Sequence, residues 1–212
     1  MRHCSIIFLL ALGLTGNAFG AGNAFDSGVQ ALNQKKLDQA ISLFSEAIRQ
    51  QPRNGAAYNN RGYAYLQKGA LDLAIADFNV PIRLLPNYYP AYSNRGLAHQ
   101  KKGEYKKSID DYSRAIQLRP GNADDYNNRG VSLAKLERSA QAIADFTEAM
   151  RLNPRLVEAY LNRGAAYCEK GDREKGIQDF KQALRLNPND PRATEGLARA
   201  RSPTEKRSYP FG

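Results

Sequence analysis

The chain has 212 residues, of which 42% are hydrophobic and 25% are charged, and a formal net charge of +10. This balance is typical of a soluble fold, and the length is sufficient for one or two ordinary domains. The two cysteines of the sequence are Cys4 and Cys168. Because Cys4 lies in a segment that we expect to be removed, the composition excludes an intrachain disulfide in the remaining chain.

Residues 1–20 have the features of an export signal. A short positive start precedes an apolar stretch at 6–14, and the small residues Ala18 and Gly20 are spaced for cleavage before Ala21. The apolar stretch is about half of the roughly 20 residues that a membrane-spanning helix needs. We therefore expect an exported protein, periplasmic if the source is bacterial and secreted otherwise. A membrane-anchored adaptor that keeps this segment is the alternative.

Residues 21–190 repeat with a period of 34 residues. One proline and one glycine recur in each copy, at Pro52, Pro86, Pro120, Pro154 and Pro188 and at Gly28, Gly62, Gly96, Gly130 and Gly164. A fixed period of this length indicates a helical hairpin that is repeated and stacked. A stack of hairpins presents a long surface instead of an enclosed pocket. The five expected units are residues 21–54, 55–88, 89–122, 123–156 and 157–190.

The unit 55–88 shows how each copy is expected to fold. Its pattern predicts one helix that ends at Gly69, where glycine tolerates the left-handed conformation, and a second helix that ends at Pro86. Gly62 lies where the two helices come closest, and Phe78 fills the space toward the neighbouring hairpin. Burial of such a ring contributes about 1.5–3 kcal/mol, so these aromatic residues are expected to be structural.

The series of aromatic, small and proline residues resembles the tetratricopeptide repeat (TPR) family. In the second unit the series is Tyr58, Gly62, Tyr65, Ala74, Phe78, Pro81 and Pro86, and in the last it is Tyr160, Gly164, Tyr167, Gly176, Phe180, Ala183 and Pro188. The resemblance implies an all-α fold, an α-α superhelix (TPR solenoid) of five helical hairpins. It also implies that the first helices line a concave inner face.

The segment after the last unit predicts a lid for the stack. Residues 191–202 form an amphipathic pattern, with Ala193, Leu197 and Ala200 on one side. A terminal repeat needs a polar cover over its apolar face, so we expect a C-terminal capping helix here. Residues 203–212 lack a periodic apolar pattern, and a disordered tail is expected.

Four units carry an arginine directly before the repeat glycine and an aspartate 16 residues after that arginine. The pairs are Arg61 with Asp77, Arg95 with Asp111, Arg129 with Asp145, and Arg163 with Asp179. The first unit has Ser27 and Leu43 at these places, so both charges are missing together. We predict structural Arg–Asp pairs within or between hairpins, for which bidentate geometry is available. Two independent surface charges are the alternative.

Asparagine recurs two residues before the repeat glycine, at Asn60, Asn94, Asn128 and Asn162. In TPR proteins this position faces the inner groove, where an amide can both donate to and accept from a ligand backbone. We predict a partner-binding groove made by these amides. Its expected apolar contacts are Tyr63, Leu66, Leu97, Val131 and Leu161. The alternative is that the asparagines tie neighbouring repeats together or cap local polar groups.

Some TPR domains hold the C-terminal carboxylate of a partner with basic side chains on successive first helices. The corresponding places here include Pro90, Asp124 and Glu158, and the last two are expected at the rim of the groove. The carboxylate-clamp pattern is therefore absent, and a receptor for chaperone tails of that type is disfavoured.

Two residues depart from the repeat. Pro81 lies inside a second helix where the other units have alanine, and it should bend that helix at a cost of roughly 3 kcal/mol unless the bend is absorbed locally. We favour a tolerated kink near the helix end over a hinge. Glu137 replaces the turn glycine of the fourth unit, so a tighter or less regular turn is expected there.

The side chains available for catalysis are few. Outside residues 1–20 the sequence has one histidine, His99, and one cysteine, Cys168. They lie two hairpins apart, beyond the roughly 3 Å that a nucleophile and its base require. The sequence contains none of the common metal-ligand or phosphate-binding motifs. We expect no catalytic residue, no cofactor and no metal site, and therefore no enzyme.

These patterns predict a TPR scaffold that binds a partner peptide or helix in its concave groove. The alternative is a basic surface that binds a polyanion or a membrane. Its strongest feature is a lysine group at one helix–helix turn, which we interpret as a solvated edge. The group is Lys101, Lys102, Lys106 and Lys107. Nucleic acid is not an expected partner, and a membrane is expected only if the signal is retained.

Overall fold

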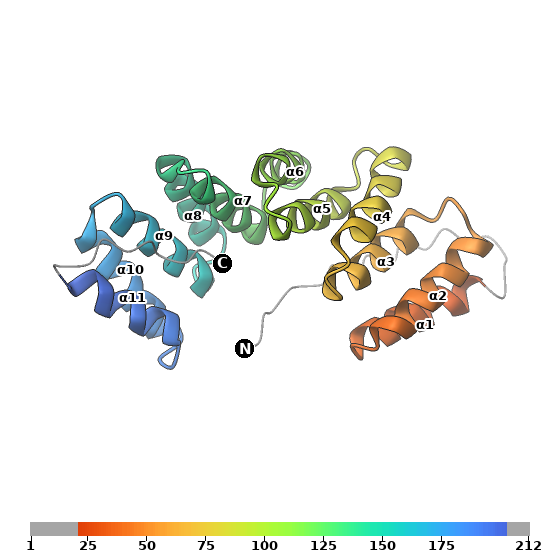
Figure 1. The fold of residues 1–212 in the computed structure, drawn as a ribbon, viewed down its shortest axis with the longest axis horizontal. Coiled ribbons are helices and arrows are strands. Elements are labelled where there is room, and N and C mark those ends of the chain that lie inside the picture. The colour runs from red at the N-terminus through yellow and green to blue at the C-terminus, as the bar shows by residue number, and fades with distance from the viewer. Residues whose placement is uncertain (1–20, 203–212) are drawn as a thin grey trace. The chain divides into compact units, whose positions relative to one another are not determined.

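The structure is a computed structural model that describes residues 21–202. Within this range the chain forms eleven helices and no strand, which confirms the predicted all-α class (Figure 1). The predicted signal at 1–20 and the predicted tail at 203–212 lie outside the described residues. Of the helices in the described range, none is long and apolar enough to cross a membrane. The chain divides into two compact units, Met1–Asn94 and Arg95–Gly212, called unit 1 and unit 2.

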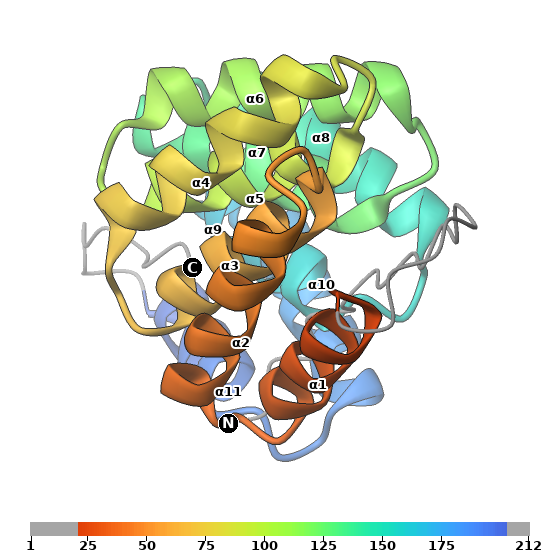
Figure 2. The same cartoon turned by 90° about the vertical axis from the view of Figure 1, so that its right-hand side faces the viewer.

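Unit 1 contains two complete helical hairpins and the start of α5. Its helices are α1 (Ala21–Asn33), α2 (Leu37–Gln50), α3 (Gly55–Gln67), α4 (Leu71–Leu84) and the first residues of α5 (Tyr89–Lys101). Helix α1 packs on α2 and α3 packs on α4, while α2 also packs on α3 (Figures 1 and 2). The two hairpins are therefore stacked side by side through their neighbouring helices.

Unit 2 continues the same plan. After the rest of α5 it contains α6 (Tyr105–Leu118), α7 (Ala123–Lys135), α8 (Ser139–Leu152), α9 (Val157–Glu169), α10 (Arg173–Leu186) and α11 (Pro191–Arg201). Helices α7 and α8 form one hairpin, and α9 and α10 form the next. The second helix of each hairpin also packs on the helix that comes next in the chain: α6 on α7, α8 on α9 and α10 on α11.

The recurring ring of each second helix lies against the recurring glycine of its own hairpin. Phe78 is fully buried, and a Cβ added at Gly62 would lie 2.8 Å from its ring. Because carbon atoms do not approach this closely without a clash, glycine at this place sets the distance between the two helices. Phe44 and Phe146 meet Gly28 and Gly130 in the same way.

The turn between the helices of the fourth hairpin is as regular as the others, so the expectation for Glu137 was wrong. Glu137 has φ 59°, in the same left-handed region as Gly69 at φ 78°. The hydrogen bond that closes the turn, from Arg138 N to Leu133 O at 3.0 Å, is matched by Ala70 N to Tyr65 O at 2.9 Å. The turn imposes its conformation on a non-glycine residue, at a local cost of roughly 1–2 kcal/mol.

Helix α4 continues through Pro81 to Leu84. The ring of Pro81 is fully buried, and a Cβ added at Gly55 would lie 3.3 Å from its Cβ atom. Leu85 N still donates to Pro81 O at 2.8 Å, so the carbonyl of the proline takes part in the last hydrogen bond of the helix. Pro81 lies close to the C-terminal end of α4, where the loss of one backbone hydrogen bond destabilises the helix least.

Helix α11 packs on α10 as the capping helix was expected to do. Its N-cap residue is Asp190, whose side chain accepts from Arg192 N and Ala193 N and so satisfies two N-terminal donors. Ala193 and Ala200 join Phe180 in a buried cluster, while the opposite face of the helix is exposed. The apolar side of the last hairpin is thereby covered.

Candidate functional site

The four predicted Arg–Asp pairs are brought together in the structure with bidentate geometry. In the hairpin of α3 and α4, Arg61 Nε lies 2.8 Å from Asp77 Oδ2 and Arg61 Nη2 lies 2.7 Å from Asp77 Oδ1. The hydrogen bonds to Asp77 raise the pKa of Arg61. The same pair of bonds joins Arg95 to Asp111, Arg129 to Asp145, and Arg163 to Asp179.

The guanidinium also reaches the preceding hairpin. Arg61 Nη1 donates to Ser45 Oγ at 3.0 Å, and Ser45 belongs to α2. The equivalent bonds in unit 2 run from Arg129 to Ser113 and from Arg163 to Thr147, each at 3.0 Å. One arginine therefore joins three helices, which is a structural role. The hydroxyl partners were not foreseen, although Ser45, Ser113 and Thr147 follow the 34-residue period and could have been found by it.

The asparagines are linked in pairs between neighbouring first helices. Asn94 Nδ2 donates to Asn59 Oδ1 at 3.1 Å in unit 1, and Asn162 Nδ2 donates to Asn127 Oδ1 at 3.0 Å in unit 2. These contacts correspond to the alternative in which asparagines tie repeats together. The amides of Asn94 and Asn128 stay half-buried. Ligand contact by the asparagines remains a prediction.

The predicted apolar contacts separate into two groups. Leu66, Val131 and Leu161 are at most 7% exposed, and the last two belong to core clusters of unit 2. Tyr63 and Leu97 are half-buried. The exposed parts of these two side chains can contact a partner, whereas the buried leucines and valine chiefly shape the helices that carry them.

His99 and Cys168 lie in packed surroundings. His99 is 8% exposed, with Nδ1 2.6 Å from Glu104 Oε2 and Nε2 3.8 Å from Asp111 Oδ2. The side chain of Cys168 fills the space above Gly176, where any Cβ would collide with its sulfur. The described residues contain no group of three histidine, cysteine or carboxylate side chains placed to hold a metal ion.

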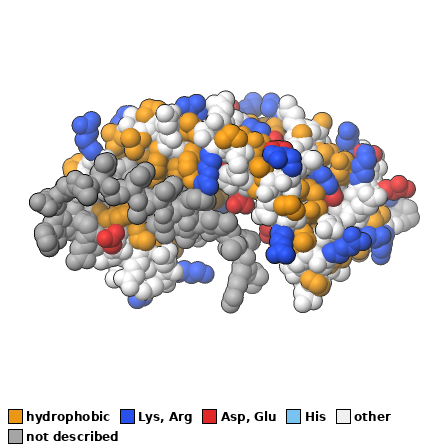
Figure 3. Space-filling view, turned by 180° about the vertical axis from the view of Figure 1, so that it is seen from behind, with side chains coloured by type: hydrophobic (Ala, Val, Ile, Leu, Met, Phe, Trp, Pro, Cys, Tyr) orange, Lys and Arg blue, Asp and Glu red, His pale blue; other side chains and the backbone are white. Residues whose placement is uncertain are grey.

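Two lysines of the group at the turn between α5 and α6 are paired with a carboxylate. All four lysines of the group are exposed, and Glu104 lies 3.2 Å from Lys107 and 3.5 Å from Lys102. The hydrogen bonds from Lys107 and His99 lower the pKa of Glu104 to about 2. On the face drawn in Figure 3, Lys and Arg side chains are scattered among uncharged and acidic ones. Neither observation favours a polyanion site.

The stacked hairpins and their linking networks define a helical repeat protein. Models of the tetratricopeptide repeat match residues 25–89, 89–122, 126–156 and 157–190. The chain therefore belongs to the tetratricopeptide repeat family. This fold is a scaffold for protein–protein interaction and is generally not enzymatic, so a protein or a peptide is the supported kind of partner.

Several solved structures are similar to this chain. The crystal structure of MamA protein has a TM-score of 0.71 and 26% identity, covering 79% of this chain and 92% of MamA. YrrB, a TPR protein with an unusual peptide-binding site, has a TM-score of 0.70 and 20% identity, covering 84% and 92%. The Arabidopsis OM64 TPR domain is 33% identical over 53% of this chain and 93% of its own, with a TM-score of 0.52. No curated protein matches the chain.

Proposed function

We propose that this chain is an exported TPR module that binds an extended or helical segment of a partner protein along the first helices of its hairpins. The observation that carries the proposal is that Asn94 on α5 and Asn128 on α7 stay half-buried, while a hydrogen bond from Asn94 to Asn59 and one from Asn127 to Asn128 hold their amides. Each bond holds an amide in one orientation before any ligand arrives.

An ordered amide is well suited to bind a peptide backbone. An asparagine side chain offers donors and an acceptor together, so it can still bind a peptide group while one of its atoms is used within the protein. Fixing the side chain in advance lowers the entropy that binding must overcome. Tyr63 and Leu97, both half-buried, add apolar contact on the same set of helices.

The comparison with YrrB supports the same kind of ligand. YrrB has a peptide-binding site, but at 20% identity the likeness to this chain is evidence for a shared fold only. The proposal therefore rests on the asparagines of this chain, and the shared fold adds only that a peptide is a ligand this architecture can bind.

The test is a selection of 12-residue peptides from a random phage-displayed library against the purified protein. Enriched peptides are titrated by fluorescence anisotropy against the wild type and the double variant Asn94→Ala/Asn128→Ala. The exposed residue Asn33 provides a matched control as Asn33→Ala. Each lost hydrogen bond is worth about 1 kcal/mol, so the double variant should bind about tenfold more weakly or worse.

Two results would count against this function. One is that no peptide is enriched. The other is that the double variant keeps wild-type affinity while its helical circular dichroism signal is unchanged, which would remove the asparagines from the binding surface.

Export is part of the proposal and has its own test. The motif at 1–20 places the cleavage before Ala21. Sequencing the N-terminus of the protein recovered outside the cytoplasm of its source cell should therefore begin at Ala21. A chain that begins at Met1 would favour the anchored adaptor instead.

A further inference from the structure

Helix α4 of unit 1 has an apolar outer face. Leu73, Ala76 and Val80 are spaced three and four residues apart, and each is turned about 140–160° from the buried Phe78. Leu73 is 53% exposed, Ala76 is also exposed, and Val80 is half-buried. We refer to these three residues as the apolar row. Because the row points away from Phe78, packing within its own hairpin does not account for it.

The other second helices are polar at the places of the two largest side chains of the row. The residues at the place of Leu73 are Gln39, Lys107, Gln141 and Lys175, and those at the place of Val80 are Glu46, Arg114, Glu148 and Gln182. The fold of a hairpin therefore does not need an apolar side chain at either place.

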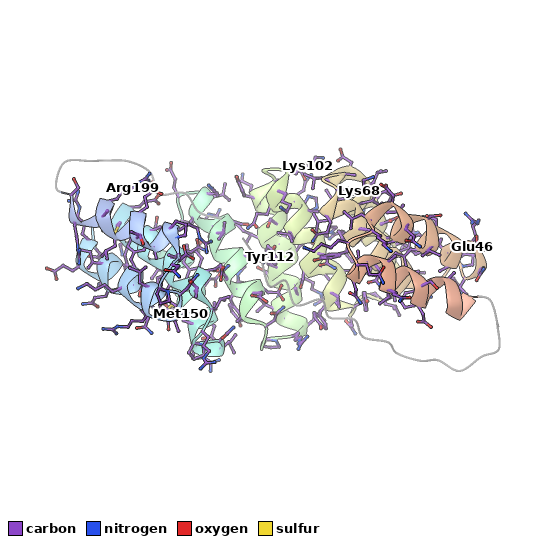
Figure 4. All side chains as sticks on the ribbon, turned by 90° about the horizontal axis from the view of Figure 1, so that it is seen from below. Glu46, Lys68, Lys102, Tyr112, Met150 and Arg199 are labelled. Carbon is purple, nitrogen blue, oxygen red and sulfur yellow. The ribbon has the colours of Figure 1, made fainter. Side chains whose placement is uncertain are left out.

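Val80 also removes a hydrogen bond that the other second helices share. In each of them the residue at the place of Val80 is joined to the residue three positions later. The pairs are Glu46 with Arg49, Arg114 with Gln117, Glu148 with Arg151, and Gln182 with Arg185, and Glu46 is labelled in Figure 4. In α4 the later position is Arg83, which is exposed and has no ion pair or side-chain hydrogen bond with any described residue.

The charges beside the row match a second copy of the same helix. Asp72 and Arg83 are both exposed, lie at opposite ends of the row and, at 100° per residue, lie on the same side of it. If two α4 helices run antiparallel with Ala76 opposite Val80, Asp72 of one copy lies within about one residue, or 1.5 Å along the axis, of Arg83 of the other. Twofold symmetry forms this contact twice.

We propose that the apolar row is the contact surface of a homodimer in which α4 packs antiparallel on α4 of a second copy. The contact removes the row from water and gives Arg83 an acidic partner, as Arg49 and Arg151 have within their own helices. A carboxylate accepts several hydrogen bonds, so the interactions of Asp72 within its own chain do not prevent this pairing.

The size of the contact predicts a reversible dimer. Helix α4 has 14 residues and is therefore about 21 Å long, so one pair of helices forms less than a standard interface. We expect the dimer to form only at high protein concentration. The dimer uses a second helix and leaves the first helices available to a partner segment, so it goes beyond the proposed function.

A helix of another protein fits the row less well. It would have to present an apolar stripe together with an acidic group for Arg83 and a basic group for Asp72, at the correct spacing. A second copy presents all of these groups by symmetry.

The first test is sedimentation velocity of the purified protein between about 5 µM and about 500 µM. The double variant Leu73→Gln/Val80→Glu introduces the residue types that α8 has at the same places, Gln141 and Glu148. It should dimerise at least about tenfold more weakly, because the apolar contact is lost. Its melting temperature should not fall, since the same residue types are accommodated in α8.

Leu85 provides a matched control. It is 52% exposed, but it is turned only about 20° from Phe78, and its Cδ1 would lie 3.7 Å from a Cβ added at Gly55. The corresponding residue after α2 is Gln51. Leu85→Gln should therefore leave dimerisation unchanged, although it removes an equally exposed leucine.

An exchange of the two charges identifies the occupant. Arg83→Asp and Asp72→Arg each place like charges opposite each other in the dimer, so each alone should weaken it about tenfold. Both substitutions in one chain recreate opposite charges between copies, and the affinity should return to within about threefold of the wild type. Side chains eleven residues apart on one helix do not meet, so this rescue can arise only between two copies.

Several results would overturn this dimer. They are a monomer at every concentration, a dimer that Leu73→Gln/Val80→Glu does not weaken, and a charge exchange that gives no rescue. If the protein without residues 1–20 no longer dimerises, the apolar stretch at 6–14 drives the association instead. If Leu73→Gln/Val80→Glu abolishes binding of the library-selected peptides, a partner occupies the row and the assignment to a second copy is wrong. The asparagine variants test the proposed function separately, so either conclusion can fail alone.

Discussion

Two joints in unit 2 follow the same backbone plan but are filled differently. Where α6 packs on α7, the ring of the second helix is Tyr112, and the hydroxyls of Ser108 and Ser132 lie 3.0 Å apart. Gln100 donates to Ser132 Oγ at 2.8 Å, so this joint contains a connected set of hydrogen bonds.

The joint where α8 packs on α9 is apolar. Phe146 takes the place of the tyrosine, and Ala142 and Ala166 take the places of the two serines. These three residues belong to one buried cluster. Asp125, whose charge adds to the effect of burial in raising the pKa of Tyr112, corresponds to the fully buried Ala159 at this joint.

The comparison shows what the repeat tolerates. Hydroxyls that bond to each other replace alanines at little cost, because their hydrogen-bonding capacity is used. The hydroxyl of Tyr112 is different, since it is fully buried and makes no hydrogen bond of good geometry, although Asn128 lies near enough to act on its pKa. The polar joint should therefore be the less stable of the two, and the source of the difference should be Tyr112.

The largest expected contrast concerns the glycines that face the two rings. A Cβ added at Gly130 would lie 2.6 Å from the ring of Phe146, whereas one at Gly96 would lie 3.3 Å from the ring of Tyr112. Overpacking costs roughly 1–3 kcal/mol, and alanine gains about 1 kcal/mol over glycine in a helix. Gly130→Ala should be destabilising and Gly96→Ala close to neutral, with unfolding free energies about 2 kcal/mol apart.

Urea denaturation followed by circular dichroism measures both variants against the wild type. Gly69→Ala is a useful third variant, because nothing lies near its Cβ position and only its left-handed φ of 78° opposes alanine. Equal losses of unfolding free energy in Gly96→Ala and Gly130→Ala would show that the distance from the added Cβ to the facing ring does not determine the destabilisation.

A reciprocal exchange of the two rings should give the next largest effect. Tyr112→Phe removes an unsatisfied buried hydroxyl and should raise the free energy of unfolding by about 1 kcal/mol. Phe146→Tyr adds a hydroxyl opposite alanine and should lower it by about 2 kcal/mol. Thermal unfolding of both variants measures the exchange. If Tyr112→Phe melts at the same temperature as the wild type, an ordered water already forms a hydrogen bond with the tyrosine hydroxyl.

The helices and their contacts could be predicted from the repeat because their causes are local. The 34-residue period locates each hairpin, and glycine facing an aromatic ring explains why two helices approach closely. The pairing of Arg61 with Asp77 followed from their shared presence in four units and shared absence in the first. Each inference used a residue whose partner recurs at a constant offset.

The turn at Glu137 and the linkage of the asparagines could not be predicted with the same certainty. Glycine is favoured in the left-handed region but is not required, and the bonds of the turn hold Glu137 there. Asn94 is equally suited to a ligand and to a neighbouring amide, since its side chain donates and accepts in both cases. Only coordinates decide which partner lies within reach.

The smallest expected effect depends on pH and compares the residues that precede α6 and α8. Glu104 accepts from Lys107 and contacts His99, and these interactions lower its pKa from 4.5 to about 2. At the same place before α8 the chain has Arg138, and the residue corresponding to His99 is Leu133. A carboxyl whose folded pKa is lowered stabilises the fold above its ordinary pKa and loses that contribution as the pH falls through the folded value.

Glu104→Gln should therefore lower the melting temperature modestly at pH 7, and the gap to the wild type should close as the pH is lowered from 4.5 toward 2. Scanning fluorimetry over this range measures the gap. Arg138→Gln serves as the control, because the arginine stays charged throughout and its gap should not close in this window. A gap for Glu104→Gln that stays constant with pH would mean that the side chain acts by packing and not by its charge.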